Sequence, residues 1–300
     1  MCNDHIEKLL TDREEKMDKL VAIILHDSKA ADKELLRDLV NRAEENRVPL
    51  IYLRTVSRFY SDPYISSQLK TWERNKRRYD LGFQKLLQQL ISNDVEFTLV
   101  KQALYSRASY DADLLFRTTE EFERVYPILQ ETVRLGLIRP DPHAGSIRHM
   151  RGCTIEIPTE DLWSRREKKS FSGTEVYVPS IEDQIILFHL HMLKHREIFL
   201  GDFISILHLY NTNHNSVLLS RLANKYSLLP IFHFVSYLFH YLKLREPEIK
   251  LNMPALSQFI KFLAYKKSQE LFPVRLPKVI LGLSVLHFRL REECAYSQFY

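Results

Sequence analysis

Two aspartates at alternate positions, Asp111 and Asp113, form the pattern in this chain that points most directly to chemistry. Apolar residues follow at once, at Leu114, Leu115 and Phe116. Alternate residues of a β-strand point to the same face, so the two carboxylates would lie side by side. Neighbouring carboxylates repel each other, and solvent, a basic side chain or a divalent cation must offset that repulsion. A metal site is therefore one physical reason to place both in an apolar strand.

A third acidic residue, Glu156, lies between Ile155 and Ile157 in the next segment that has the character of a strand. It is again a charge inside an apolar run. Three carboxylates on adjacent strands can hold two Mg²⁺ ions for in-line phosphoryl transfer. The residues also leave an alternative open, in which Asp111 and Asp113 lie on the solvated face of an edge strand and Glu156 belongs to no common site.

The composition excludes several other kinds of site. The chain has 300 residues and a formal net charge of +5, which permits a polyanionic ligand without requiring one. Its seven glycines never have the spacing of a dinucleotide fingerprint or a P-loop. The three cysteines lie too far apart for a metal or redox unit, and their odd number does not fit a disulfide framework. No apolar run is long enough to span a membrane, so we expect a cytoplasmic protein with no membrane partner.

The carboxylates fall in the second of three regions that differ in pattern. Residues 1–93 carry apolar positions at helical spacing and predict an N-terminal helical region. Residues 94–179 carry short β-branched and aromatic runs and predict a small α/β core. Residues 180–300 predict a C-terminal helical domain that begins with Ser180 as the N-cap and Asp183 as its capping-box partner. The expected fold class is therefore α+β.

The elements inside these regions follow from the same signals. A helix over residues 78–93 should close the N-terminal region, after a turn at residues 61–63. A second helix should begin at Thr118 or Thr119, with glutamates in its first turn, and end near Leu135. Four strands are expected, at residues 95–100, 110–116, 153–157 and 175–178.

Several short motifs then occur in an order that one enzyme family shares. They are Leu99-Val100-Lys101-Gln102-Ala103-Leu104-Tyr105-Ser106-Arg107, Tyr110-Asp111-Ala112-Asp113-Leu114-Leu115, Glu156, Pro179-Ser180-Ile181-Glu182-Asp183, His191-Met192-Leu193-Lys194-His195-Arg196 and Asp202. In these motifs, over residues 30 to 215, the chain resembles the uncharacterised nucleotidyltransferase family of the DNA polymerase beta superfamily. The resemblance implies a small mixed nucleotidyltransferase-type sheet, flanked by an N-terminal helical layer and a C-terminal helical bundle.

The resemblance also implies an activity and a site. The activity is Mg²⁺-dependent (or Mn²⁺-dependent) transfer of a nucleoside monophosphate from an NTP, with ATP the expected donor, to an acceptor that is a small molecule, an RNA end or a protein. The three acidic residues would be the catalytic metal ligands, and the segment after the first strand would bind the nucleotide. The residues concerned are Asp111, Asp113 and Glu156 for the metal, and Lys101, Gln102, Ser106 and Arg107 for the nucleotide.

Two positions depart from the family pattern. Gln102 stands where the family has a glycine after the lysine, and that glycine lets the backbone approach a phosphate closely. Pro158 stands where the family has a histidine after its glutamate strand. Two further hypotheses therefore stay open: a protein of this fold that binds a nucleotide or a partner without turnover, and a helical interaction module whose acidic strand is incidental.

Histidines and basic runs offer weaker signals. His191 and His195 share a helix face, as zinc ligands on a helix do, but no third ligand accompanies them. We therefore expect both to be mostly buried on a face turned toward the sheet, with no bound zinc, and expect the histidines at 189, 191 and 195 to brace the sheet together with Asp202. The basic residues at 74–79, with Trp72 before them, fit a solvated helix face as well as a nucleic-acid surface. The run at 165–169 is typical of an exposed loop or helix.

Overall fold

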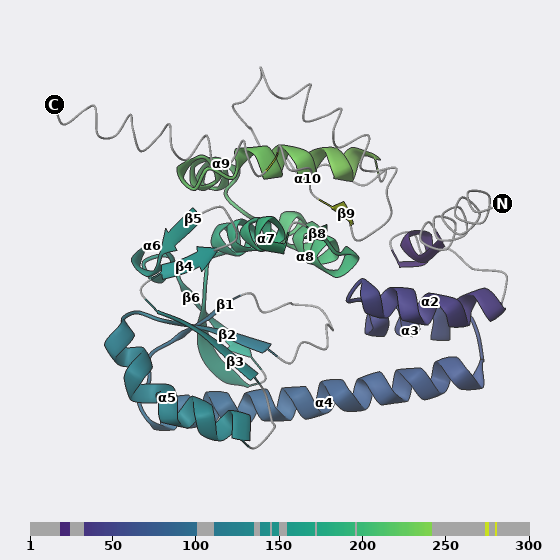
Figure 1. Ribbon diagram of the computed structural model, residues 1–300, viewed down its shortest axis with the longest axis horizontal. Coiled ribbons are helices and arrows are strands. Elements are labelled where there is room, and N and C mark those ends of the chain that lie inside the picture. The colour runs from purple at the N-terminus through teal and green to yellow at the C-terminus, as the bar shows by residue number, and fades with distance from the viewer. Residues whose placement is uncertain are drawn as a thin grey trace, which may run out of the picture.

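A small β-sheet lies between two sets of helices, with α4 and α5 on one face and α7 to α10 beyond the other (Figure 1). This computed structural model describes residues 19–24, 33–100, 111–134, 139–144, 146–149, 155–171, 173–195, 197–241, 274–275 and 280. Over these ranges the chain is α+β, as the sequence predicts, with a five-stranded mixed sheet.

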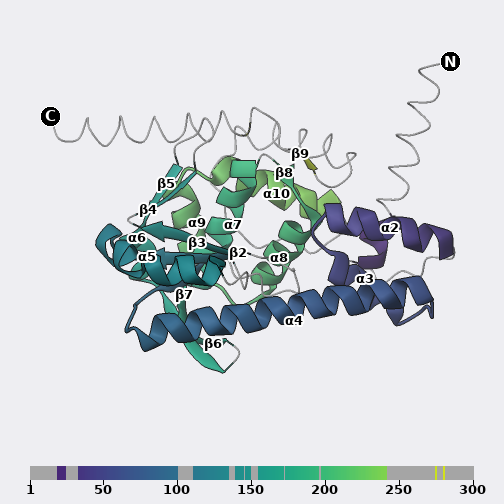
Figure 2. The same cartoon turned by 60° about the horizontal axis from the view of Figure 1, so that its bottom comes forward.

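In the part of the chain that the structure describes, a helical segment at residues 19–24 and the helices α2 (Lys33–Glu45), α3 (Pro49–Ser57) and α4 (Pro63–Ser92) precede the sheet. The expected turn at residues 61–63 is the start of α4, because Asp62 accepts hydrogen bonds from the backbone N–H groups of Tyr64 and Ile65 at 2.9 and 3.1 Å. Pro63 follows in the first turn, where a helix needs no N–H donor. From this start α4 continues for 30 residues, a length of about 45 Å. It reaches from the sheet to α2 and α3 (Figure 2).

The five-stranded sheet has the order β3-β2-β1-β7-β6. Its strands are β1 (Thr98–Val100), β2 (Asp111–Phe116), β3 (Arg139–Ala144), β6 (Glu167–Phe171) and β7 (Thr174–Val178). β2 runs antiparallel to β1 and parallel to β3, while β7 is parallel to β1 and antiparallel to β6. Three of the four expected strands lie in this sheet, at β1, β2 and β7.

The sequence does not predict β3, because Pro140 and Pro142 argue against a strand. Among the described strands β3 pairs with β2 alone and lies at the edge of the sheet, and an edge strand tolerates residues that lack an N–H donor. The two prolines are two residues apart, so their nitrogens face the same side of the strand. On the side of β3 that faces away from β2, a residue without an N–H donor costs the sheet no hydrogen bond.

The fourth expected strand is found outside this sheet. It is β5 (Ile155–Pro158), and it pairs with β4 (Ser146–His149) in a separate two-stranded antiparallel sheet. The short helix α6 (Thr159–Trp163) follows β5 directly. A third small sheet pairs β8 (Glu197–Ile198) with β9 (Val274–Arg275).

The basic run at residues 165–169 is neither an exposed loop nor a helix, as the sequence had suggested, but leads into the edge strand β6. Arg166 lies between two aromatic rings, 4.0 Å from the centroid of Trp163 and 4.1 Å from that of Tyr177. Cations stack favourably on aromatic faces, so this part of the run stabilises the fold. The lysines of β6 stay exposed, as is common on an edge strand that must not pair with another chain.

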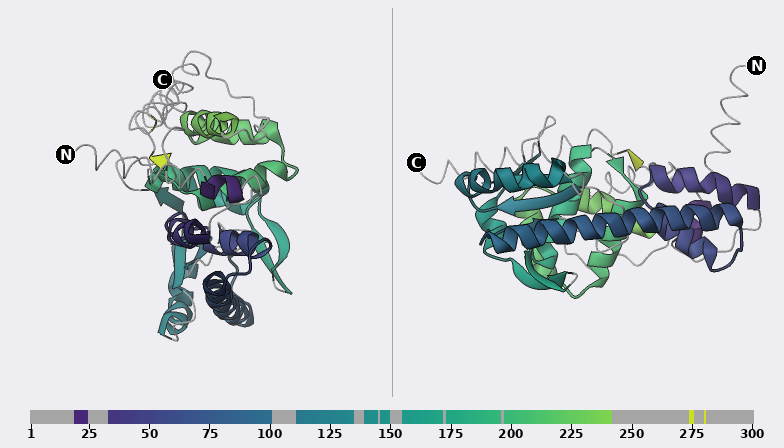
Figure 3. Two further views of the ribbon diagram at one scale, coloured as in Figure 1. Left: turned by 90° about the vertical axis from the view of Figure 1, so that its right-hand side faces the viewer. Right: turned by 90° about the horizontal axis from the view of Figure 1, so that it is seen from below.

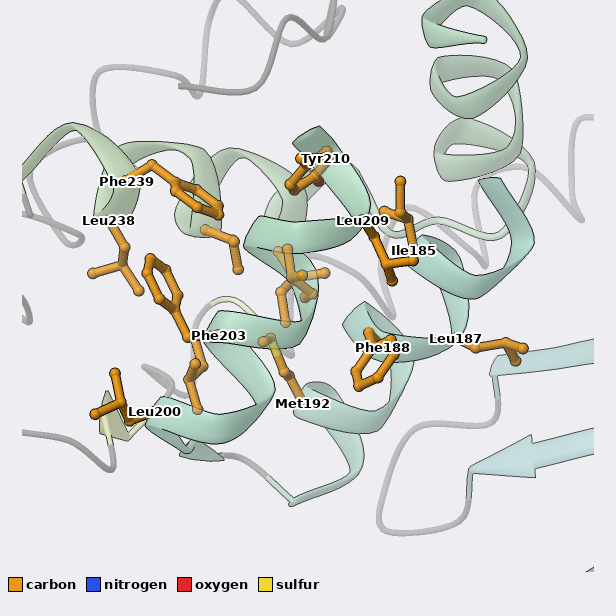
Figure 4. Close-up of a cluster of buried hydrophobic side chains, with 14 of the residues drawn as sticks. Ile185, Leu187, Phe188, Met192, Leu200, Phe203, Leu209, Tyr210, Leu238 and Phe239 are labelled. Carbon is orange, nitrogen blue, oxygen red and sulfur yellow. The ribbon is translucent and has the colours of Figure 1, made fainter. Parts of the chain in front are cut away.

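The helices around the sheet complete the two hydrophobic layers. They are α5 (Thr119–Arg134), α7 (Ile181–His195), α8 (Leu200–Asn211), α9 (Ser216–Lys225) and α10 (Leu229–Tyr241). The prediction that Ser180 is the N-cap of α7 is confirmed, since the Asp183 N–H donates to the Ser180 hydroxyl. That hydroxyl donates in turn to the Asp183 carboxylate, whereas in a capping box the carboxylate would accept from the Ser180 backbone N–H. Figure 4 shows the interior between α7, α8 and α10, where Met192, Phe203 and Phe239 meet.

Successive residues of β2 pack into two different cores. Leu114 and Phe116 belong to the cluster formed with α4 and α5, whereas Leu115 belongs to the cluster that contains the α7 to α10 side chains. β1 divides in the same way, with Leu99 in the first cluster and Val100 in the second. The sheet is thus covered on both faces, and alternation along each strand decides which side chains meet which helices.

The N-terminal helices dock onto the start of α8 through Arg47. This residue follows α2 in a left-handed conformation (φ 63°), and its guanidinium donates to the buried Asp202 carboxylate at 3.2 Å. The same guanidinium stacks on the Phe199 ring at 3.7 Å, and the Gly201 N–H donates to the Asn46 carbonyl at 3.0 Å. Asp202 therefore joins two helical layers, rather than bracing the sheet as the sequence suggested.

Replacing Gly201 by alanine should destabilise this junction. A Cβ atom at residue 201 would lie 2.9 Å from the Arg47 carbonyl oxygen, a backbone atom that cannot turn aside. We expect Gly201→Ala to lower the free energy of unfolding by about 1–3 kcal/mol, the usual cost of overpacking, as measured by urea denaturation. Val217→Ala, at an exposed position of α9, is the control and should leave the midpoint unchanged. An unchanged midpoint in both variants would mean that the junction has room to adjust.

Candidate functional site

Asp113 lies on β2 between two strands of the sheet, and its side chain keeps 18% of its surface exposed. In the strand register Asp113 is opposite Val100 of β1 on one side and Asp141 of β3 on the other. It is two residues from Leu115, which is fully buried against the C-terminal helices. The carboxylate therefore belongs to the face of the sheet that those helices cover, yet it remains accessible to a ligand.

A histidine that the sequence did not single out lies next to this carboxylate. The Nε2 atom of His143 is 3.5 Å from the Asp113 Oδ1 atom. His143 is on β3, two residues beyond the register partner of Asp113, so parallel pairing of the strands brings the two together. Its side chain is 16% exposed, and the contact becomes an ion pair when the imidazole is protonated. The sequence could have indicated His143 only through a prediction of strand β3, and Pro140 and Pro142 argue against that prediction.

Of the other two acidic residues of the predicted site, Asp111 is on the same strand as Asp113, whereas Glu156 belongs to a different sheet. Asp111 is the first residue of β2, opposite Arg139 of β3. Glu156 is in β5, opposite Arg148 of β4, and that pair is separate from the five-stranded sheet. The expectation that all three lie on adjacent strands of one sheet is therefore wrong. Among the side chains that the structure describes, no cluster of three metal-ligating residues is found.

The predicted nucleotide-binding residues Lys101, Gln102, Ser106 and Arg107 lie outside the described residues. The chain order still relates them to the aspartates, because residues 101–110 connect the end of β1 to the start of β2. Val100, which directly precedes Lys101, is the register partner of Asp113.

A buried ion pair fixes α7 beside the sheet. Arg165 donates two hydrogen bonds to the Asp183 carboxylate, at 2.8 and 2.7 Å, and Asp183 is completely buried. Burial raises the pKa of the Asp183 carboxyl, although the guanidinium and the Ser180 hydroxyl act in the opposite direction. Such a two-fold contact fixes orientation as well as distance. The helix that covers the aspartate face is thus held at its first turn.

His189 has a structural role inside the C-terminal helices. Its Nδ1 atom is 2.8 Å from the Ile185 carbonyl oxygen, so Nδ1 carries the proton and donates, and Nε2 accepts from the Tyr210 hydroxyl at 3.3 Å. The ring stacks on Phe232 with centroids 3.7 Å apart. Burial lowers the pKa of His189 to about 3, so the ring is neutral at physiological pH.

The two histidines of the possible zinc pair are less buried than the sequence predicted. The rings of His191 and His195 meet edge to face, with centroids 4.4 Å apart, which confirms that they share a helix face. His191 is only partly buried and His195 is exposed. The expectation that both are mostly buried is therefore wrong for His195, which lies at the last residue of α7 where the helix leaves the core.

Comparison with protein-family models, with curated proteins and with solved structures gives no match for this chain. Within the part of the chain that the structure describes, no helix combines the length and the apolar character needed to cross a bilayer.

Protonation of His189 should make the stability of this chain depend on pH. The unfolded ring has a pKa near 6.5 and the folded ring a pKa of about 3, so the unfolded chain binds a proton in this interval and the folded chain does not. The free energy of unfolding should therefore fall as the pH falls below 6.5, by about 1.4 kcal/mol per unit from His189 alone. Burial also lowers the pKa of His233, which adds to the slope.

Urea denaturation at several pH values checks this prediction. His189→Gln should be less stable than wild type at neutral pH, because it loses the ring stacking, but its stability should fall less steeply with acid. His208→Gln, at an exposed position of α8, is the control and should keep the wild-type slope. An equal slope in wild type and His189→Gln would assign the acid sensitivity to other groups.

Proposed function

We propose that this chain is a nucleotidyltransferase-like protein that transfers a nucleoside monophosphate from an NTP, with ATP the expected donor, to a small molecule, an RNA or a protein, and releases pyrophosphate. The observation that carries the proposal is the position of Asp113. Its carboxylate is partly exposed on a strand whose other residues, apart from Asp111, are apolar. Its register partner is Val100, which directly precedes Lys101. The sequence resemblance supplies the activity.

Asp111 and Asp113 are the residues that would hold Mg²⁺, since carboxylate oxygens are the ligands this ion prefers. A bound Mg²⁺ would neutralise charge on the triphosphate and orient it. His143, 3.5 Å from Asp113, would act as a positioning residue that limits the orientations of the carboxylate. The resemblance also assigns Glu156 to this acidic set, but β5 pairs with β4 outside the five-stranded sheet, so the proposal rests on Asp111 and Asp113.

The nucleotide would lie beyond the end of β1. Lys101 and Arg107 would face the triphosphate as cations, with Gln102 and Ser106 beside them. A lysine contributes a point charge to a phosphate rather than a ligand to the metal. Loss of Lys101 should therefore weaken nucleotide binding more than metal binding.

A binding protein without turnover is the second candidate function. Gln102 favours it, because a side chain at this position prevents the close approach of backbone and phosphate that glycine permits. Pro158 favours it as well, since it replaces the histidine that follows the family's glutamate strand. The third candidate, a helical interaction module, would show no metal-dependent nucleotide binding.

Asp113→Asn should remove metal-dependent nucleotide binding while it preserves the fold. Asparagine has the same shape but no charge, so we expect Mg²⁺-dependent ATP affinity to fall by more than about 100-fold, the upper range of what outer-shell changes cost. The melting temperature should stay equal or rise, because one of two like charges is removed. Calorimetry with Mg²⁺ and a non-hydrolysable ATP analogue measures binding, and labelled NTP with a cell extract measures transfer.

The matched control is Asp94→Asn, an exposed aspartate in the turn after α4 whose φ of 52° asparagine also adopts. It should bind and transfer like wild type. Binding without transfer by wild type would favour the second candidate function. An absence of Mg²⁺-dependent binding in wild type would contradict both nucleotide hypotheses.

Gln102→Gly separates an attenuated site from one that never acts on nucleotides. If the glutamine obstructs the phosphates, the glycine found in the family should raise nucleotide affinity or turnover, and the gain should need Mg²⁺. Gln102→Ala is the control, because it shortens the side chain without the freedom of glycine at positive φ. No gain in either variant would count against a phosphate site at this position.

A further inference from the structure

The solvent face of α4 carries an unusual concentration of positive charge. The helix has six basic and two acidic residues, a net +4 in a chain whose total is +5. Both acidic residues are already paired, Glu73 with Arg54 at 3.4 Å and Asp80 with Lys76 at 2.7 Å. The charge that remains is therefore basic and lies along one helix.

Five of these cations lie on one face of the helix, which we call the α4 basic stripe: Lys70, Arg74, Arg77, Arg78 and Lys85. All five are exposed. Arg74 is four residues after Lys70 and three and four residues before Arg77 and Arg78, and Lys85 follows Arg78 by seven residues, which is two helical turns. The opposite face holds Tyr79, Phe83 and Leu87, which are buried against the sheet. None of the five stripe residues forms an ion pair within the part of the chain that the structure describes.

The stripe is open along its length. Seen from below, α4 lies across the front of the molecule (Figure 3). From Lys70 to Lys85 the helix rises about 22 Å, far enough for a polymer with regularly spaced charges to contact several cations at once. A nucleic-acid strand carries such charges, one phosphate about every 3.4 Å. Arginine supplies three of the five cations, and its planar fork fits phosphate oxygens in pairs.

An anionic membrane surface fits the same face less well. A basic helix that binds lipid inserts its apolar face between the head groups. In α4 that face is the buried interior of the protein, where Phe83 and Leu87 have no exposed surface. Between Arg78 and Lys85 of the stripe one large apolar residue, Leu81, is exposed, so the surface offers charge without an insertion face.

We infer that the α4 basic stripe binds the phosphate backbone of a nucleic acid. The contact is sequence-independent, because the aromatic residues expected beside the basic run are turned inward: Tyr79 is buried, and the Trp72 indole N–H donates to Glu44. Without bases stacked on aromatic rings, affinity comes from phosphate contacts and falls steeply with salt. The stripe lies on the opposite side of the sheet from Asp113, so this inference and the proposed function fail separately.

Fluorescence anisotropy with labelled single-stranded RNA, single-stranded DNA and duplex DNA, each about 20 nucleotides long, tests the stripe at several salt concentrations. The combined variant Arg74→Gln, Arg77→Gln and Arg78→Gln removes its central charges. We expect its Kd at about 100 mM salt to rise by at least about tenfold, and the slope of log K against log salt on single strands to fall by about 2, because each lost phosphate contact removes about 0.7. The three probes show whether RNA or DNA is preferred.

The control removes the same charge elsewhere, at three exposed positions: Arg117→Gln between β2 and α5, Arg124→Gln in α5 and Arg221→Gln in α9. It should lose less than about threefold in affinity. Glutamine is a good helix former, so both variants should melt like wild type. Equal losses in the two variants would overturn the proposal by assigning binding to net charge. Failure of wild type to bind any probe at low salt would also overturn it, as would binding only to vesicles that contain phosphatidylserine.

Discussion

Side-chain alternation along β2 divides this molecule into two hydrophobic cores. Leu114 and Phe116 fill the core under α4 and α5, while Leu115 enters the core of the C-terminal helices. A shift of the strand by one residue would exchange these faces and place both aspartates against α4 and α5. Apolar burial on both sides of the sheet therefore fixes the register, and the register fixes where the carboxylates lie. The candidate site depends on the packing of its apolar neighbours more than on any contact of its own.

Two buried ion pairs fix how the helical layers pack against the sheet and against each other. Arg165 and Asp183 hold the first turn of α7, and Arg47 and Asp202 join the N-terminal helices to α8. Both aspartates are buried, and leaving either one without its arginine would cost far more than an exposed pair is worth. Apolar packing would allow the helices several nearby positions, whereas these pairs select one. The elements around Asp113 are thus oriented by ion pairs far from it in the sequence.

Local signals predicted much of this fold, and distant contacts account for the rest. The strand with Asp111 and Asp113, the helix from Thr119 and the cap at Ser180 all follow from patterns within a few residues. β3 and His143 did not, because two prolines hide an edge strand that is held by parallel pairing with β2. The partner of Asp202 is 155 residues away, and no local pattern indicates it. The alternation of residues along β5 predicts a strand but does not determine which strand it pairs with. For this reason the sequence did not show that β5 belongs to a separate sheet.

In α4, packing determines the residues of the buried face and leaves the residues of the exposed face undetermined. Its first half packs with Ile65 and Leu69 among the N-terminal helices, and its second half packs with Phe83 and Leu87 against the sheet. These contacts use one side of the helix and leave the other without a structural task. Substitutions on such a surface usually change stability little, so packing does not require basic residues there. Like charges three or four residues apart on a helix are mildly destabilising. Packing therefore does not explain five cations on this face of a helix whose two acidic residues are already paired, and the external polyanion that we propose would offset their mutual repulsion.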